Sequence, residues 1–350
     1  MLFMRSKEIV GIDIGSSSVK LVQLSEQKGN YQLRNVGILP LPSEAIVDNS
    51  LMDTTSIVET IKDLMKSLGS RAQEAVCSIS GNSVIIRKIS LPAMTPEELE
   101  DQIAWEAEQY IPFDINDVNL DFEILDTDLS ASGKMTVLLV ASKKEIINEY
   151  VSVFNEAGLK LVVVDVDSFA VQNIFEMNYS PPENEVIALV NIGASIMNMN
   201  VVKGGVSLFT RDVQMGGNLY TEEIQRQFSF SSKDAEKCKI TGECPDKEKL
   251  KDTISRVNDT LSLEINRSLD FYNSTAEDLK IGKIFLSGGG SKTSMLSESL
   301  SQRLGLPVEL LNPLQKISFS EKEFDPEYLQ EIAPLIAVAA GLAMRRLGDK

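Results

Sequence analysis

The chain has 350 residues, with 51 acidic and 34 basic side chains, a formal net charge of −17 and no histidine. The missing histidine excludes Ser-His-Asp and Cys-His nucleophilic sites and every zinc centre with a histidine ligand. The negative charge gives no general attraction to DNA, RNA or anionic lipid, so we expect no nucleic-acid partner. The length, with 43% hydrophobic residues, predicts two domains or one large two-lobed unit.

The first predicted elements are a β-hairpin, a third strand and a helix. Alternating apolar residues predict two strands within Glu8–Leu24, separated by a tight turn of sequence Asp-Ile-Gly-Ser-Ser. A third strand is predicted at Gln32–Leu39. The segment Thr54–Leu68 carries apolar residues on one helical face, and Gly69 stands where a left-handed cap is expected.

A segment of different character follows. Thr95, Pro96 and Glu98 form the capping-box pattern of a helix start, and this helix, to about Tyr110, carries the only tryptophan, Trp105. Its indole either fills a small core or lines a groove. The further elements that we expect here are strands at Val118–Leu125, Met135–Ala141 and Leu159–Val166 and a helix at Lys143–Ala157. We interpret residues 91–164 as an inserted α/β subdomain.

The first hairpin recurs at Glu185–Val202, after a Pro-Pro step that marks the boundary between halves. The copies match at an acid or amide, a glycine and a serine: Asp13 with Asn191, Gly15 with Gly193, and Ser17 with Ser195. A further strand follows the second copy at Val206–Arg211. A repeat of this length is not a solenoid period, so it predicts two similar lobes that face each other.

The second half continues with helices and one more apolar strand. A helix is expected near Leu219, a long helix at about Lys249–Ser274, a strand at Lys283–Leu286, a helix through Leu304 and a last helix at Ala333–Leu347. We assign residues 1–90, 165–182 and 332–350 to the first lobe. Residues 183–218 and 281–331 then form the core of the second lobe, and residues 219–280 form its subdomain.

The cysteines and the apolar segments predict a cytoplasmic protein. Cys77, Cys238 and Cys244 are too few for a disulfide framework, and we expect reduced thiols. The N-terminal residues do not form a signal peptide, and the longest apolar run, Leu335–Met344, is about half of the ~20 residues that cross a bilayer. We therefore expect no direct membrane insertion, and any link to the membrane to come through a partner.

Glycine turns at strand ends carry the chemistry. They occur at Asp13–Ser18, Asn191–Ser195, Gly216–Asn218 and Ser287–Ser291, where the backbone can approach phosphate without a side-chain clash. Neither a Walker A motif nor GxGxxG is present. Two such turns on facing lobes predict a polyphosphate site, with Asp13 as the carboxylate on the Mg²⁺ side and Lys20 as a neutralising cation.

Each signal has an ordinary structural alternative. A single DxG turn is usually only a turn, Gly288–Gly290 alone is equally a flexible connector, and Lys20 alone is more often a solvated strand residue. The repetition of the first turn, with further glycine turns at strand ends, is what favours a nucleotide.

These motifs resemble those of a known superfamily. GIDIGSSS and VNIGAS, with GGN and LSGGGS, resemble the phosphate and adenosine motifs of actin-like ATPases. Three stretches are more narrowly similar to the PilM family of type IV pilus assembly, which is related to FtsA: GIDIGSSSVKLVQL, residues 91–125, and VDVDSFAVQN. The resemblance covers essentially the whole chain. It implies a two-lobed actin-like α/β fold, with two duplicated mixed-sheet lobes and a small subdomain inserted in the first.

The resemblance also implies ATP and Mg²⁺ as cofactors and assigns residues to them. Asp13 orients Mg²⁺, and Asp167 positions the attacking water. The phosphate contacts are Gly15, Ser16, Ser17, Ser18 and Lys20 from the first lobe and Gly193, Ala194 and Ser195 from the second. The remaining assigned contacts are Gly216, Gly217 and Asn218 on the ribose-phosphate side, Glu264 and Arg267 at the ribose and adenine, and Gly288, Gly289 and Ser291 over the adenosine. Glu264 and Arg267 are equally an ordinary exposed helical pair.

One departure concerns hydrolysis. Many members of the superfamily have an aspartate where this chain has Asn191. Asn191 would then be the second residue near Mg²⁺, after Asp13, and it has no carboxylate. We therefore expect ATP to be bound well and hydrolysed slowly if at all.

The function implied is that of a cytoplasmic scaffold of the type IV pilus inner-membrane platform. Its partners would be the cytoplasmic N-terminal tail of PilN, bound in a groove flanked by the inserted subdomain, and other platform proteins. Two alternatives stay open. One is a small-molecule kinase of the same superfamily, and the other is a filament-forming protein like FtsA.

Overall fold

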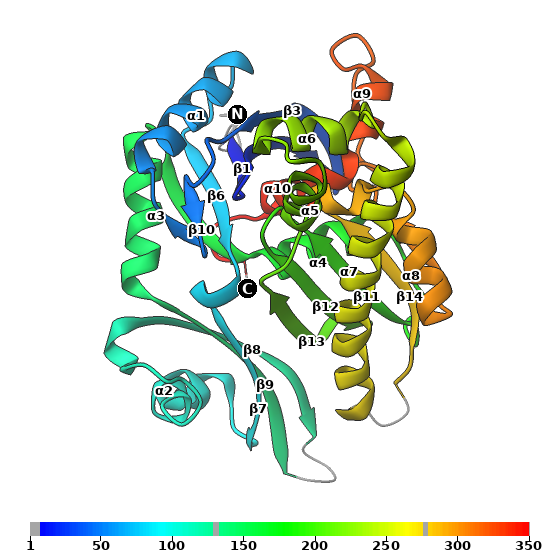
Figure 1. The fold of residues 1–350 in the computed structure, drawn as a ribbon. Helices are drawn as coiled ribbons and strands as arrows, with labels where there is room; N and C mark the ends of the chain where they lie inside the picture. Colours follow the sequence, from blue (N-terminus) through cyan, green and yellow to red (C-terminus); the bar gives the residue numbers. More distant parts are fainter. Residues whose placement is uncertain (1–7, 129–132, 276–278, 350) are drawn as a thin grey trace.

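The computed structural model describes residues 8–128, 133–275 and 279–349. Residues 1–7, which belong to the segment predicted not to be a signal peptide, lie outside this range. Two five-stranded sheets have matching strand orders (Figure 1). The first runs β10 (Lys160–Val166), β6 (Glu74–Ile79), β1 (Ile9–Ile14), β2 (Ser18–Gln27), β3 (Asn30–Pro40). The second runs β15 (Val308–Leu310), β14 (Ile281–Ser287), β11 (Val186–Ile192), β12 (Met197–Lys203), β13 (Val206–Val213).

The duplicated hairpin is confirmed in register. Asp13 pairs with Lys20 across β1 and β2, and Asn191 pairs with Asn198 across β11 and β12. The same backbone hydrogen bond closes both turns: the Gly15 N–H donates to the Ser18 carbonyl at 3.1 Å, and the Gly193 N–H to the Ile196 carbonyl at 2.8 Å. β1 is parallel to β6, and β11 is parallel to β14, so each turn lies at the carboxyl end of a central strand.

Two central helices, α4 (Asp167–Asn178) and α10 (Ala337–Met344), lie between the sheets (Figure 1). One hydrophobic core joins both sheets to these helices, and it includes Val22, Leu24, Phe175, Leu189, Val338 and Leu342. Small residues in α10 allow this approach. A Cβ on Gly341 would clash with the Ala170 carbonyl of α4, and a Cβ on Gly11 would clash with the Ala339 carbonyl of α10.

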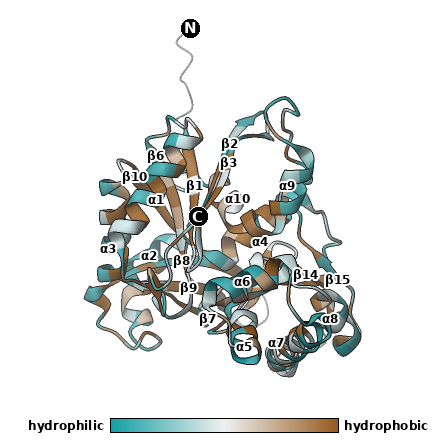
Figure 2. Ribbon diagram, turned by 45° about the horizontal axis from the view of Figure 1, so that its top comes forward, coloured by the Kyte–Doolittle hydropathy of each residue, from teal (hydrophilic) through white to brown (hydrophobic). Residues whose placement is uncertain are grey.

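The outer faces of the sheets are covered by further helices. On the first sheet lie α1 (Thr54–Ser67) and α3 (Lys144–Glu156), and the second sheet packs α7 (Lys247–Thr275) and α8 (Leu296–Leu304). Helix α1 buries Ile57, Ile61 and Leu64, as the sequence predicted, while its other faces carry hydrophilic residues (Figure 2). The remaining elements are α5 (Asn218–Phe228), α6 (Ser232–Thr241), α9 (Pro326–Ile332), the short β4 (Ile46–Val47) and β5 (Ser50–Leu51), and four 3₁₀ turns, η1 (Gly81–Ser83), η2 (Ile115–Asp117), η3 (Gly289–Lys292) and η4 (Ala333–Ile336).

The inserted subdomain is a three-stranded sheet of order β7-β9-β8 with one helix. Its elements are β7 (Ile85–Pro92), α2 (Pro96–Ala107), β8 (Val118–Asp128) and β9 (Lys134–Lys143). The predicted capping box is present, with Thr95 and Glu98 bonded reciprocally, although α2 ends three residues before Tyr110. Helix α2 buries Leu99, Ile103 and Ala107, whereas Trp105 is 67% exposed. The interpretation of Trp105 as a core residue is therefore wrong.

The insert also has different limits from those expected. β7 begins at Ile85, before the predicted start at 91. β10, which we expected inside the insert, pairs in parallel with β6 of the first sheet, and α3 packs on α1 and β10. The helix–strand pattern of residues 143–166 was correct, but a short apolar strand does not reveal which sheet it joins, because that pairing is made over a long sequence distance. The other domain boundaries stay predictions.

Within the described residues, one apolar helical stretch, Pro326–Met344, has the length and hydropathy of a membrane span. It comprises α9, η4 and α10, and 67% of it is buried inside the fold, where it forms part of the central core.

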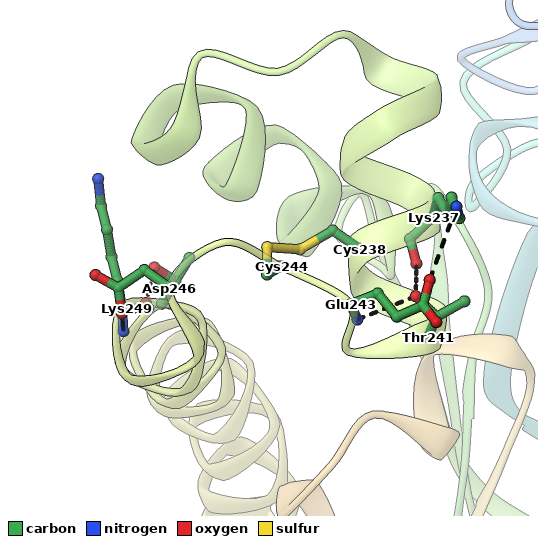
Figure 3. The surroundings of a disulfide bond; sticks show 8 residues. Lys237, Cys238, Thr241, Glu243, Cys244, Asp246 and Lys249 are labelled. Carbon is green, nitrogen blue, oxygen red and sulfur yellow. Dashed lines mark hydrogen bonds and ion pairs between the residues drawn. A yellow bond between two sulfur atoms is a disulfide. The ribbon is translucent and has the colours of Figure 1, made fainter.

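A disulfide joins Cys238 to Cys244 (Figure 3), so the expectation of three reduced thiols is wrong for this pair. Cys77 is free and buried. Cys238 lies near the end of α6, with 1% of its surface exposed. The helix ends at Gly242 in a left-handed conformation (φ 69°). That cap reverses the chain, so the two Cα atoms are 5.5 Å apart. The Gly242 cap was the signal in the sequence that could have suggested this pairing.

The central packing predicts the effect of one methyl group. Gly341→Ala should lower the free energy of unfolding by about 1–3 kcal/mol, because overpacking of α10 against α4 outweighs the gain in helix propensity. Urea denaturation followed by circular dichroism measures it. Gly282→Ala is the matched control, since its Cβ would make only ordinary contact, 3.4 Å from the Glu185 carboxylate. Equal stability of the two variants would contradict the close-packing argument.

Candidate functional site

A cleft of about 2090 Å³ lies between the two lobes. The glycine turns from both halves line it. The predicted site residues on its wall are Asp13, Gly15, Ser16, Ser17, Ser18, Lys20, Asp167, Asn191, Gly193, Ala194, Ser195, Gly217, Asn218, Gly288 and Gly289. Residues as far apart in the chain as Asp13 and Gly289 therefore meet around one space.

The first turn carries a half-buried ion pair. The Lys20 Nζ lies 3.0 Å from Asp13 Oδ2, and the two side chains are 14% and 13% exposed. The pair forms because the two residues are directly opposite each other in the hairpin. A Cβ on Gly15 would lie 2.8 Å from the Lys20 ammonium, so glycine at this position leaves room for the lysine beside the turn. The arrangement puts one carboxylate and one cation next to the backbone N–H groups of the turn.

Asp167 begins α4 and faces the same part of the cleft. Its carboxylate accepts a hydrogen bond from the Ser78 hydroxyl at 2.5 Å. Burial, followed by the charge of Asp13, raises the pKa of Asp167 to about 7, against the opposing effect of hydrogen bonds from Ser78 and Ser80. Near neutral pH this carboxyl group can therefore both hold and release a proton.

The second turn has amides where the first has charges. Asn191 accepts a hydrogen bond from the Ser287 hydroxyl at 3.1 Å and donates one to Asn198 Oδ1 at 3.1 Å. Asn198 in turn donates to Asp212 Oδ1 at 2.8 Å. Burial raises the pKa of Asp212, and its hydrogen bonds from Asn198 and the Gly81 N–H act in the opposite direction. The Asn191 amide therefore has partners on both its oxygen and its nitrogen.

The third turn packs directly on the second. The Gly217 N–H donates to the Gly193 carbonyl and the Asn218 N–H to the Ala194 carbonyl, each at 2.8 Å. A Cβ on Gly216 would lie 2.5 Å from the Gly193 carbonyl oxygen. Gly216 supports the turn from behind and, unlike Gly217 and Asn218, is not part of the cleft wall.

The fourth turn is held from the first lobe. Gly288 adopts φ 82°, and its N–H donates to the Pro334 carbonyl at 2.7 Å. Ser291 is 2% exposed and donates its hydroxyl to the Gly288 carbonyl at 2.6 Å. Ser291 thus stabilises the turn but, contrary to the sequence-based assignment, does not line the cleft.

Glu264 and Arg267 do not line the cleft either. Glu264 pairs with Arg211 of β13 at 3.1 Å and with Arg267 at 3.4 Å. Helix α7 contributes only residues of its first half, Lys247 to Asp259, to the cleft wall. At 1.5 Å of rise per residue, Glu264 lies about 7 Å beyond that part of the helix. The cleft wall gives no support to the assignment of these two residues to ribose and adenine, which stays a prediction. Glu264, whose side chain is 16% exposed, does not fit an ordinary exposed pair either.

The sequence reasoning missed a group of lysines on the cleft wall. They come from α6, α7 and η3: Lys233, Lys239, Lys247, Lys251 and Lys292. Lys239 Nζ is 2.6 Å from Glu236 and 3.0 Å from the Thr221 hydroxyl. The spacing of four residues between Lys247 and Lys251 puts both on one helical face, which was the available signal. Without the fold, that face had no known neighbour.

The donor chemistry of the cleft fits a hard cation. Among the described residues, no group of three or more His, Cys, Asp or Glu side chains could hold a metal ion by itself. Asp13 and Asp167 supply carboxylate oxygens, which suit Mg²⁺ held largely by water and by a bound anion. Asn191 has its amide oxygen already bonded to Ser287, so Asp13 is the better placed of the two predicted metal-side residues.

The family described as type IV pilus assembly protein PilM matches residues 11–347. The chain belongs to the PilM family. A solved chain of the PilM-PilN type IV pilus biogenesis complex is 31% identical, covers 97% of this chain and 98% of its own length, and superposes with a TM-score of 0.88. The resemblance drawn from the sequence motifs is therefore confirmed.

More distant relatives share the fold. The ethanolamine utilization protein EutJ of Carboxydothermus hydrogenoformans is 15% identical, with 97% and 90% of the two chains covered and a TM-score of 0.61. FtsA of Bacillus subtilis is 22% identical over 253 residues, which are 66% of this chain and 57% of FtsA, so the match spans little more than half of that protein. The two-lobed actin-like α/β fold of this PilM-family protein is confirmed.

The pKa of Asp167 predicts how stability depends on pH. Because its folded-state pKa, about 7, lies above the ordinary 3.8, the folded protein binds this proton more tightly than the unfolded chain. The contribution of Asp167 to stability is thus full below pH 4 and is lost as the pH rises towards 7. The variant Asp167→Asn keeps an acceptor for Ser78 but does not titrate. Its free energy of unfolding relative to that of the wild type should therefore be higher at pH 8 than at pH 4.5, by on the order of 2 kcal/mol.

Urea unfolding of the nucleotide-free protein at both pH values measures this difference. Asp63→Asn, at an exposed position of α1, is the control and should track the wild type. A constant gap between Asp167→Asn and the wild type at both pH values would show that Asp167 does not titrate as described.

Proposed function

We propose that this PilM-family chain is an ATP-binding scaffold of the type IV pilus inner-membrane assembly platform. In this role it binds the cytoplasmic N-terminal tail of PilN and hydrolyses ATP slowly or not at all. The observation that carries the nucleotide part is the pair of hairpin turns, closed by the same hydrogen bond in each lobe, on opposite walls of one cleft. The family assignment favours this scaffold over a small-molecule kinase.

The chemistry of the cleft supports a polyphosphate ligand. Glycine turns at strand ends offer backbone N–H groups to phosphate oxygens. Lys20 adds a cation beside the first turn. Lysines of α6 and α7 lie on the opposite wall, which also carries the acidic residues Glu222, Glu236 and Asp259. Mg²⁺ bound near Asp13 would neutralise part of the phosphate charge. It would also weaken the ion pair between Asp13 and Lys20.

The two turns support slow turnover. Asp167, with a pKa of about 7, can accept a proton from water at neutral pH. The second turn, however, has Asn191 in place of a carboxylate, and its amide is bonded to Ser287 and Asn198. Asp167 can therefore polarise water, but only the first of the two turns carries a carboxylate that could hold the metal. This supports slow hydrolysis.

The partner assignment rests on the solved relative, whose structure is a PilM-PilN complex. A tail from a membrane protein would bring an acidic cytoplasmic protein to the inner membrane, a surface that its own charge does not favour. Binding of an extended peptide beside sheet edges is a common recognition mode. Contacts with other platform proteins belong to the same proposal.

Calorimetry tests the nucleotide site. Mg-ATP should bind the wild type at one site, and Asp13→Ala should weaken binding at least about tenfold, because it removes a charge-assisted contact to the hydrated metal. With EDTA present, the two proteins should bind ATP with similar affinity. Asp63→Ala is the control. An absence of saturable binding to the wild type would exclude the nucleotide function, and a tenfold loss that persists in EDTA would exclude a metal role for Asp13.

Fluorescence anisotropy tests the partner. A labelled peptide with the sequence of the cytoplasmic tail of PilN from the same genome should bind saturably, while a scrambled peptide of equal composition should not. The measurement is repeated with and without Mg-ATP. If neither condition gives binding stronger than the scrambled control, the PilN assignment is wrong, whatever the result with nucleotide.

A further inference from the structure

Four neighbouring strands of the second sheet carry polar residues at the same level. The residues Ser287, Asn191, Asn198 and Asp212 come from β14, β11, β12 and β13, and each is the register partner of the next. Side-chain hydrogen bonds of 3.1, 3.1 and 2.8 Å connect them in this order. We call these four residues the polar row.

The polar row is largely buried, reaches the cleft wall at Asn191 and Asn198, and ends on the other lobe. Ser287, Asn191 and Asn198 are 1%, 9% and 3% exposed. At the far end, Asp212 Oδ2 accepts the backbone N–H of Gly81 at 2.5 Å. Gly81 belongs to η1 in the first lobe, directly before the first strand of the insert. Both carboxylate oxygens of Asp212 therefore have a donor, one from each lobe.

The carboxylate determines the direction of every bond in the row. An ionised carboxylate only accepts hydrogen bonds, so Asn198 must turn its NH₂ group to Asp212. Its oxygen then faces Asn191, which must present its own NH₂ group there. The Asn191 oxygen is left to face the Ser287 hydroxyl. The orientation of an amide in the second glycine turn is thus set by a residue two strands away.

The corresponding part of the first lobe is built differently. There Asp13 and Lys20 occupy the positions of Asn191 and Asn198, and they form an ion pair at the turn itself. In the second lobe the acid stands at Asp212, where it contacts the first lobe. The negative charge is kept away from the turn, and its effect reaches the turn through two amides.

We propose that Asp212 is a positioning residue for the nucleotide site, which fixes whether the Asn191 amide presents its donor or its acceptor to the bound phosphates. The inference rests on the proposed ATP-binding function. A reversed amide would exchange a hydrogen-bond donor for an acceptor next to anionic oxygens, and binding would weaken.

The variant Asp212→Asn tests this without removing hydrogen bonds. Its new amide must use the oxygen for the Gly81 N–H and the NH₂ group for Asn198, so both asparagines of the row turn over, and the Ser287 hydroxyl changes from donor to acceptor. The fold is therefore retained, which thermal unfolding checks. Calorimetry should show Mg-ATP affinity reduced by about tenfold, as expected for a reversed polar contact to a charged ligand.

The double variant Asn198→Asp with Asp212→Asn separates positioning from loss of charge. It has the composition of the wild type, and the carboxylate introduced at position 198 accepts hydrogen bonds from both neighbours, so Asn191 regains its native orientation. We expect its Mg-ATP affinity to recover to within about threefold of the wild type. The Asn191 side-chain NH₂ resonance in ¹⁵N NMR should shift in Asp212→Asn and return in the double variant.

Each outcome decides one claim. A wild type that does not bind Mg-ATP overturns the proposed function itself. If the wild type binds and Asp212→Asn binds equally well, Asp212 does not position the site. A double variant as weak as the single variant, with the NMR resonance still shifted, also overturns the inference. Asp63→Asn, which removes one exposed carboxylate from α1, should leave affinity unchanged, and the inference requires that Asp212→Asn differ from it.

Discussion

Contact between backbones at the centre of the molecule determines how closely the central helices and the first sheet pack. Gly341 of α10 lies against the Ala170 carbonyl of α4, and Gly11 of β1 lies against the Ala339 carbonyl of α10. Side chains of both sheets pack around these helices in one core. Because protein interiors are densely packed, the missing side chains at these positions set how closely the sheets approach. The separation of the turns that follow β1 and β11 depends on that approach.

The two copies of the hairpin differ in their charged and polar side chains. Both copies have the same register at the turn and the same closing hydrogen bond, yet the first holds a carboxylate and a lysine, whereas the second holds two asparagines. A charged pair gives the first turn a metal-side ligand and a cation. The amides give the second turn directed hydrogen bonds without a formal charge. A site that binds a polyphosphate strongly and turns it over slowly is consistent with this asymmetry.

The elements that depend on neighbouring residues were predictable. Alternating residues predicted the hairpins, the capping box at Thr95 predicted the start of α2, and Gly69 predicted the end of α1. The glycine turns that line the cleft were predictable as well, because a strand end followed by glycine is a local pattern. Local patterns did not predict the contacts over long distance. The sequence of β10 does not state that it joins β6, and the sequence of α7 does not state that Glu264 lies beyond the cleft.

The disulfide and the polar row also show the difference between what local sequence patterns predict and what only long-range contacts determine. Cys238 and Cys244 are six positions apart, but only the reversal at Gly242 brings them together. The absence of histidine and the charge of −17 are properties of the composition, and they excluded whole classes of chemistry at once. The duplicated turn, its residues and its family were also determined by the sequence alone. The tertiary structure decided which lysines face the cleft, which predicted residues lie outside it, and that Asp212 contacts Gly81. These depend on the crossing of helices and the pairing of strands, which bring together residues that no local pattern connects.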